Sequence, residues 1–305
     1  SGNLDTIVGN PDDPLIGNTG LTTYPVEEAA GLIFVFVRAD DYPDEDVPPL
    51  SEDLPLRFPE NSERFPHPLW PAAPSLLDEN VVALGIHRTG EANWRIACEN
   101  GFDNAHILVH KDNTIVQSNN WVLPLGIRPA SEDCITVFDD DDGPKGMMQW
   151  LFTDRWEPIL ENKTLGVKVE GLNSRLYRTS VILPGVLLVE NWPEEGVAQY
   201  EWYVPITEDT YEYWEVLVKH CPTDEDRVQF SYRFDTVYQP LALRGFNDCD
   251  LHAREAMQDF YADGTGWQKE QLVETDVSAI MWRKLASRHN RGIAAPPPGA
   301  QGRDK

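Results

Sequence analysis

Two histidines and an aspartate stand at helical spacing near residue 100. In the run from Asn93 to His110, Asp103, His106 and His110 occupy positions i, i+3 and i+7. On a helix they would share one face, so both imidazoles could point a ring nitrogen at one atom, while the carboxylate holds the other N–H of the nearer ring. This spacing predicts half of a metal site, although a bare His-x3-His is about as often an ordinary pair of helix histidines.

The residues just before this group are polar and include a glycine. Glu99, Asn100 and Gly101 interrupt a segment that otherwise carries apolar residues at helical spacing. Glycine inside a helix costs about 1 kcal/mol relative to alanine, so it needs a structural reason. A kink or the close approach of a ligand near Gly101 would supply one.

A third ligand is needed, and a carboxylate in the second half of the chain can provide it. The pattern Asp250-x4-Glu255-x2-Gln258 is predicted to open a second helix, Leu251–Phe260, with Asp250 among its polar capping residues. His252 is two residues from Asp250, so it would face away and is not expected to bind. This segment therefore offers a carboxylate that could complete a site with the two histidines.

Together these two segments resemble the catalytic domain of the Rieske non-haem iron oxygenases. The run Asn93–His110 is followed 140 residues later by Asp250, counted from His110. Within the family the pattern is most similar to the terminal oxygenases of the carbazole 1,9a-dioxygenases. The resemblance implies that His106, His110 and Asp250 bind a mononuclear Fe(II). Three protein ligands on one side of iron leave positions open for O2 beside a substrate.

The resemblance also implies an activity and partners. The expected reaction is dihydroxylation of carbazole at its angular 1 and 9a positions, which gives 2'-aminobiphenyl-2,3-diol, with electrons from a ferredoxin and its reductase. The expected assembly is a homotrimer, in which Asp103 hydrogen-bonds His106 and carries electrons from the cluster of a neighbouring subunit. The expected substrate contacts are Asn100, Gly101, Ile107, Phe246, Leu187, Val189 and Trp192.

Two other functions remain open. The chain could be a Rieske oxygenase acting on another polycyclic aromatic, or a monooxygenase, and product analysis would separate these. It could also be a metal-free carrier of hydrophobic ligands, since domains of the helix-grip type often only bind. The three ligand-type residues argue against a carrier, and iron content would decide.

Composition limits the partners and the location. A formal charge of −26, from 25 Lys+Arg against 51 Asp+Glu, argues against nucleic acid and anionic membranes. No apolar run approaches the roughly 18 residues of a membrane span, and no signal peptide is recognised, so a cytoplasmic protein is expected. The four cysteines show no Cys-x-His spacing, so the ligands of the [2Fe–2S] cluster expected in the intact protein are not in this sequence. The sequence is interpreted as a fragment or a clipped chain.

Four segments are predicted. Residues 1–38 resemble the last strands of a Rieske domain, residues 39–80 are a proline-rich acidic connection, residues 81–293 are the iron-binding catalytic domain, and residues 294–305 are a flexible tail. The catalytic domain is expected to be α+β, with a curved antiparallel sheet gripping a long C-terminal helix. Its expected strands are Val81–Ile86, Thr114–Gln117, Trp121–Leu125, Cys134–Phe138, Leu165–Val169, Leu176–Leu183, Val186–Glu190, Gln199–Pro205, Tyr211–Lys219 and Val228–Phe234, and a last helix is expected at Thr275–Asn290.

Overall fold

The structure is a computed structural model of the chain. It describes residues 2–37, 47–54, 73–103, 106, 110, 113–119, 135–139, 145–151 and 177–289. The chain divides into two compact units, Ser1–Leu50 and Ser51–Lys305. In the first unit, β1 (Val26–Ala29) and β2 (Leu32–Val35) pair antiparallel, and Gly31 takes a positive φ of 82° in the tight turn between them. The short helix α1 (Leu50–Asp53) spans the division.

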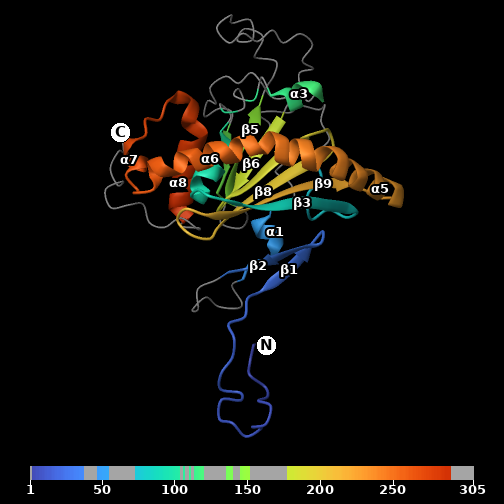
Figure 1. Ribbon diagram of the computed structural model, residues 1–305, viewed down its shortest axis with the longest axis vertical. Helices are drawn as coiled ribbons and strands as arrows, with labels where there is room; N and C mark the ends of the chain where they lie inside the picture. The colour runs from blue at the N-terminus through green and yellow to red at the C-terminus, as the bar shows by residue number, and fades with distance from the viewer. Residues whose placement is uncertain are drawn as a thin grey trace, which may run out of the picture. The chain divides into compact units, whose positions relative to one another are not determined.

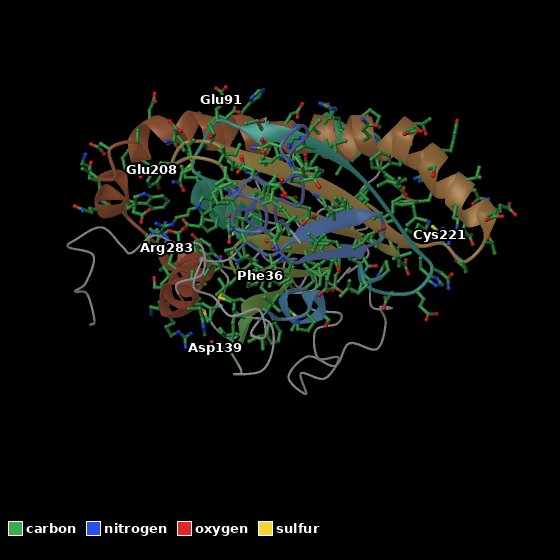
Figure 2. The ribbon with its side chains drawn as sticks, turned by 90° about the horizontal axis from the view of Figure 1, so that it is seen from below. Phe36, Glu91, Asp139, Glu208, Cys221 and Arg283 are labelled. Atoms are coloured by element: carbon green, nitrogen blue, oxygen red, sulfur yellow. The ribbon has the colours of Figure 1, made fainter. Side chains whose placement is uncertain are left out.

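A seven-stranded antiparallel sheet dominates the second unit. Its strand order is β3-β9-β8-β7-β6-β5-β4, so most neighbours in space are also neighbours in sequence. The strands are β3 (Val81–Gly90), β4 (Ile135–Phe138), β5 (Gly146–Leu151), β6 (Tyr177–Ile182), β7 (Val186–Glu190), β8 (Val197–Pro205) and β9 (Tyr211–His220). Figure 2 labels Glu208, in the turn between β8 and β9, and Cys221, beyond the far end of β9.

Helices cover one face of this sheet. The longest helical stretch runs without a break through α5 (Asp224–Arg233), the wide π-type turn η4 (Phe234–Phe246) and α6 (Asn247–Tyr261), and it crosses the strands in Figure 1. Helix α2 (Trp94–Phe102) packs against β6, β7 and β8. The other helices in the described residues are α3 (Thr114–Ser118), α7 (Gly266–Lys269), η5 (Glu274–Asp276) and α8 (Val277–His289).

The main apolar core lies between α2, α8 and the sheet. Trp94 of α2 and Trp282 of α8 are both buried, with ring centroids 6.0 Å apart, and Leu187 and Tyr203 belong to the same cluster. Of the helices in the described part of the chain, none combines the length and the apolar character needed to cross a bilayer. The α+β prediction is confirmed, with an antiparallel sheet and a long helix.

Two predicted strands are helices instead. Val228–Phe234 falls in α5 and η4, because Thr223 and Asp226 form a reciprocal capping box that starts a helix just before it. Thr114–Gln117 falls in α3, where the Asn113 side chain accepts the backbone N–H of Ile115 at 2.9 Å. The last helix, β3, β4 and β6 to β9 are confirmed within a few residues, whereas β5 was not predicted. The predicted strands Trp121–Leu125 and Leu165–Val169 lie outside the described residues.

Candidate metal centre

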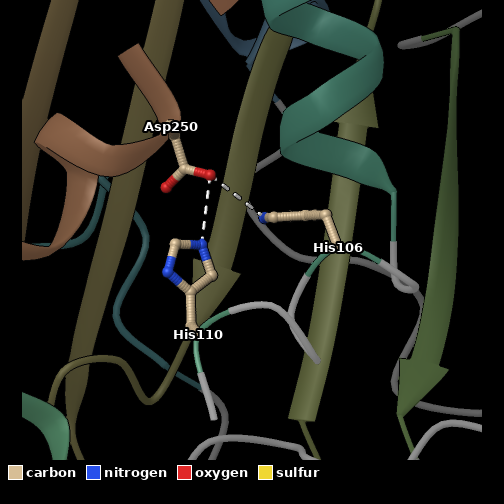
Figure 3. Close-up of side chains that lie close together, drawn as sticks. All are labelled: His106, His110 and Asp250. Carbon is tan, nitrogen blue, oxygen red and sulfur yellow. Dashed lines mark hydrogen bonds and ion pairs between the residues drawn. The ribbon is translucent and has the colours of Figure 1, made fainter. Parts of the chain in front are cut away.

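Three side chains from distant parts of the chain converge beneath the long helix. His110 Nε2 lies 3.1 Å from Asp250 Oδ1, and His106 Nε2 lies 3.5 Å from the same oxygen. Figure 3 shows both rings pointing their Nε2 atoms at this carboxylate. One ligand atom from each residue lies within 4.8 Å of the other two, which is the arrangement that a single metal ion requires.

The histidines do not lie on the helix that their spacing predicted. Helix α2 ends at Phe102, and Asp103 has an extended backbone with φ −79° and ψ 112°. The prediction that Asp103, His106 and His110 share a helix face is therefore wrong. An aspartate competes for nearby backbone N–H groups and so favours the end of one helix and the start of another turn.

Asp103 contacts His106 through both its backbone and its side chain. Its Oδ2 accepts the backbone N–H of His106 at 3.2 Å, and its backbone carbonyl oxygen makes a short contact with His106 Nδ1. Because a carbonyl can only accept, Nδ1 carries the proton and Nε2 is left as the lone-pair nitrogen that a metal needs. The Asp103 carboxylate was expected to hold the ring, and the contact with Nδ1 comes from the backbone carbonyl of the same residue.

Asp250 is positioned by the interior of the long helix and not by a helix start. Residues 224–261 are continuously helical. Asp250 lies in the first turn of α6, but this turn continues directly from η4 and does not start a new helix. Burial alone would raise the pKa of Asp250, but the hydrogen bond from His110 and the nearby His106 and Arg254 outweigh burial and lower the pKa to about 2. Asp250 is therefore a carboxylate at neutral pH, although only 6% of its surface is exposed.

Aromatic rings close one side of the three ligands. The Phe246 ring lies tilted against the His110 ring, with their centroids 4.3 Å apart, and the ring centroids of Trp192 and Phe246 are 5.1 Å apart. Val189 packs against the same cluster. Of the predicted substrate contacts, the structure therefore brings Phe246, Trp192 and Val189 together beside His110.

The other predicted contacts lie around the end of α2. A Cβ at Gly101 would lie 2.4 Å from Tyr203 Oη and 2.9 Å from Leu187 Cδ2, so Gly101 and Leu187 are neighbours. The close approach that was expected of a ligand at Gly101 is made by the Tyr203 side chain of the protein. Asn100 accepts a hydrogen bond from Arg254 Nε at 2.6 Å, and Ile107 lies outside the described residues. His252 is 79% exposed and does not join the ligands.

Substituting Gly101 by alanine is expected to lower the free energy of unfolding by about 1–3 kcal/mol, the usual cost of overpacking a core. The new Cβ would press on Tyr203 Oη, which is held in place because it donates to Glu201 Oε2 at 2.5 Å. Denaturant unfolding of Gly101→Ala, Tyr203→Phe and the double variant checks this. The two changes should couple favourably, because removing the hydroxyl removes the nearest clash; additive effects would contradict the geometry.

Several polar residues behind the ligands were missed at the sequence level. Glu201 is 5% exposed and accepts hydrogen bonds from Tyr203, Tyr213 and Gln199. Arg254, one helical turn after Asp250, is 3% exposed. The alternation of Gln199, Glu201 and Tyr203 on one face of β8 was a usable signal, because strand residues two apart point the same way.

A second missed group ties β9 and β3 to the long helix. Glu215 is fully buried and accepts from Arg88 Nε at 3.0 Å and from Asn247 Nδ2 at 2.5 Å. Burial, with the nearby Glu201, raises the pKa of Glu215 to about 7. Asn247 lies three residues before Asp250, so this contact helps to fix the start of α6 beside the ligands.

The donor set fits an iron ion. Two imidazole nitrogens and one carboxylate oxygen on one side are the ligands typical of non-haem Fe(II) oxygenases, which keep other positions open. The orientation of the His106 ring by Asp103 and the ionised state of Asp250 both suit metal binding. The sequence spacing and the resemblance thus identified His106, His110 and Asp250, which the fold does bring together.

Comparison with known proteins gives the same picture. The family described as homotrimeric ring hydroxylase matches residues 42–294. The terminal oxygenase component CarAa of carbazole 1,9a-dioxygenase from Metapseudomonas resinovorans is 40% identical over 300 residues, covering 96% of this chain and 72% of that protein.

Solved structures extend this likeness to the fold. A structure of the 2-oxoquinoline 8-monooxygenase component is 72% identical with a TM-score of 0.87, covering 100% of this chain and 71% of that one. The oxygenase in a reduced complex with ferredoxin from carbazole 1,9a-dioxygenase is 36% identical with a TM-score of 0.74, covering 100% of this chain and 74% of that one. A mononuclear iron and a Rieske cluster are typical of such proteins. The chain belongs to the homotrimeric ring hydroxylases, which are Rieske non-haem iron oxygenases of aromatic rings, and it carries their catalytic domain.

Proposed function

We propose that this chain hydroxylates a fused-ring nitrogen heteroaromatic with O2, using Fe(II) held by His106, His110 and Asp250. The convergence of these three ligand atoms within 4.8 Å is the observation that carries the proposal. Bound Fe(II) supplies the single-electron chemistry toward O2 that amino acid side chains cannot perform. The protein contributes the ligand geometry, the orientation of the rings and the shape of the space beside them.

Each nearby residue has a definite task in this proposal. The backbone carbonyl of Asp103 fixes the tautomer of His106, and buried Asp250 remains ionised. Phe246 and Trp192 form an apolar wall against His110, which suits a flat ring and excludes water. Leu187 and Val189 extend that wall from β7, and Gly101 marks its edge at the end of α2.

The comparisons favour a substrate other than carbazole. The relative described as 2-oxoquinoline 8-monooxygenase shares 72% identity with this chain, whereas the carbazole oxygenase shares 40%. Residues that shape a pocket change faster than the fold, so the more similar protein is the better guide to the substrate. We therefore propose a bicyclic lactam of the 2-oxoquinoline type and the insertion of one oxygen atom, in place of the expected angular dihydroxylation.

Electrons must come from outside this domain. Insertion of one oxygen atom from O2 consumes two electrons and two protons and releases water. We propose that a ferredoxin and its reductase supply the electrons to a Rieske cluster, and that Asp103 passes them on between subunits of a homotrimer. Strands β1 and β2 are proposed to be the last strands of the cluster domain, and residues 39–80 the connection to the catalytic domain.

A substrate comparison tests this proposal. The purified trimeric holoenzyme, with ferredoxin and reductase, is supplied with 2-oxoquinoline or carbazole, and the products are identified by mass spectrometry with 18O2. We expect a singly hydroxylated lactam containing one labelled oxygen, formed at least about ten times faster than any carbazole product. Faster turnover of carbazole to a diol containing two labelled oxygens would restore the original expectation.

A further inference from the structure

Three residues lie side by side on the face of the sheet toward α2. Thr179 of β6 pairs directly with Val189 of β7, and Val189 pairs directly with Gln199 of β8. Directly opposed residues in antiparallel strands point to the same face of a sheet. Thr179 and Gln199 therefore flank Val189 on one face.

That face looks toward the metal centre. Val189 packs with Trp192 and Phe246, and the Phe246 ring lies against the His110 ring with their centroids 4.3 Å apart. Next to Thr179 in the same row is Gln149 of β5, whose side chain donates to the backbone carbonyl of Phe102 at the end of α2 at 2.8 Å. The row thus spans the sheet between the end of the α2 helix and the ring beside His110.

Both flanking residues hold a buried polar atom that has no hydrogen-bond partner in the part of the chain that the structure describes. Gln199 is 2% exposed and Thr179 is 5% exposed, and among the described residues neither Gln199 Oε1 nor Thr179 Oγ1 finds a hydrogen-bond partner. The orientation of the Gln199 amide is fixed, because its Nε2 donates to Glu201 Oε1 at 2.5 Å and a carboxylate can only accept. Within the described residues, Gln199 therefore presents an unused acceptor, and Thr179 an unused hydroxyl.

Buried polar groups without partners are rare in native proteins and call for an explanation such as an absent ligand. We propose that Gln199 Oε1 and Thr179 Oγ1 form the polar rim of the substrate pocket and select a fused aromatic ring that carries an N–H donor and a carbonyl group. The flat ring lies over Val189, Gln199 accepts the N–H, and the Thr179 hydroxyl donates to the carbonyl oxygen. This inference rests on the proposed function and deepens it, because it names the residues that would distinguish a lactam from a plain hydrocarbon.

The neighbouring residue in β6 offers a matched control. Ser180 is fully buried and its hydroxyl also lacks a partner among the described residues, but it pairs with Leu188 on the opposite face of the sheet. Ser180→Ala therefore removes the same kind of group as Thr179→Val, one residue away and on the other face.

Binding to the full-length holoenzyme, loaded with Fe(II) and kept anaerobic, tests the inference. Isothermal titration calorimetry compares 2-oxoquinoline, its N-methyl derivative, which lacks the donor, and naphthalene, which lacks both polar groups. We expect the unaltered protein to bind 2-oxoquinoline about tenfold more tightly than the N-methyl compound, the usual effect of one hydrogen bond. Gln199→Met should remove this preference. Thr179→Val should lower the affinity for 2-oxoquinoline about tenfold and leave the affinity for naphthalene unchanged. Ser180→Ala should change neither affinity.

Equal affinities for 2-oxoquinoline and its N-methyl derivative in the unaltered protein would overturn the inference. So would a Thr179→Val variant that behaves like Ser180→Ala, and this test does not depend on Gln199→Met folding normally. Iron content and ring hydroxylation are measured on the same preparation. If both persist, only the inference about the polar rim has failed; if the protein holds no iron, the proposed function has failed as well.

Discussion

Asp250→Asn is expected to lower affinity for Fe(II) and ring hydroxylation by at least about 100-fold, because even groups that only orient a ligand contribute about 10–100-fold. The change keeps the shape of the side chain but removes its charge. Asp250 is buried and ionised, with its pKa lowered to about 2, and it faces both histidines. An amide would leave the two imidazoles without the anionic ligand that completes the set.

Retained iron is measured after desalting protein loaded anaerobically with Fe(II), and hydroxylation is measured on the same sample. His252→Asn is the matched control, because this histidine lies on the same helix two residues away but is 79% exposed and is paired with Glu255. The control should keep its iron and its activity. An Asp250→Asn variant that does the same would show that the carboxylate does not bind the metal.

Arg254→Met should lower the free energy of unfolding by about 3 kcal/mol or more, the usual cost of removing one member of a buried ionic group. Arg254 is 3% exposed, donates to Asn100 Oδ1 at 2.6 Å and lies 5.0 Å from the centre of the Tyr213 ring. Its Nη2 is 4.0 Å from Glu201 Oε2. The variant would leave the Glu201 carboxylate buried without this cation and would break the link between α6 and α2.

Urea unfolding, with the slope fitted separately, measures this effect. Arg227→Met is the matched control, since Arg227 is an exposed arginine on the same continuous helical stretch, and it should change stability by less than about 0.5 kcal/mol. A change below about 1 kcal/mol for Arg254→Met would mean that the buried polar group behind the ligands does little to hold the two helices together.

The ligands could be predicted from sequence although their local structure could not. The spacing of His106 and His110 suggested a helix, but Asp103 ends α2 and caps the next turn. The ligands still meet Asp250, because the long helix brings it across the sheet to them. No local pattern encodes a contact between residues 140 apart, so only the resemblance joined the two halves.

Strands were predicted correctly where the pattern of apolar residues and the turn residues both indicated a strand. The prediction failed where a capping box starts a helix. Val186–Glu190 was predicted with its observed bounds, because a Pro-Gly turn precedes it and apolar residues fill it. Val228–Phe234 has strand-like residues, yet the Thr223–Asp226 capping box makes it helical. Arg254 and Glu201 escaped prediction because charged residues are expected at the surface, and only the fold shows that they face each other in the interior, with Arg254 Nη2 4.0 Å from Glu201 Oε2.

The most direct test of the central claim is the amount of iron in excess of acid-labile sulfide, per chain, after anaerobic loading with Fe(II) and desalting. A Rieske cluster contributes equal numbers of iron and sulfide, so the difference reports the mononuclear site alone. We predict a difference of about one iron per chain in the unaltered protein, and close to none in Asp250→Asn. A difference near zero in the unaltered protein, or one that Asp250→Asn leaves unchanged, would contradict the assignment of His106, His110 and Asp250 as the iron site.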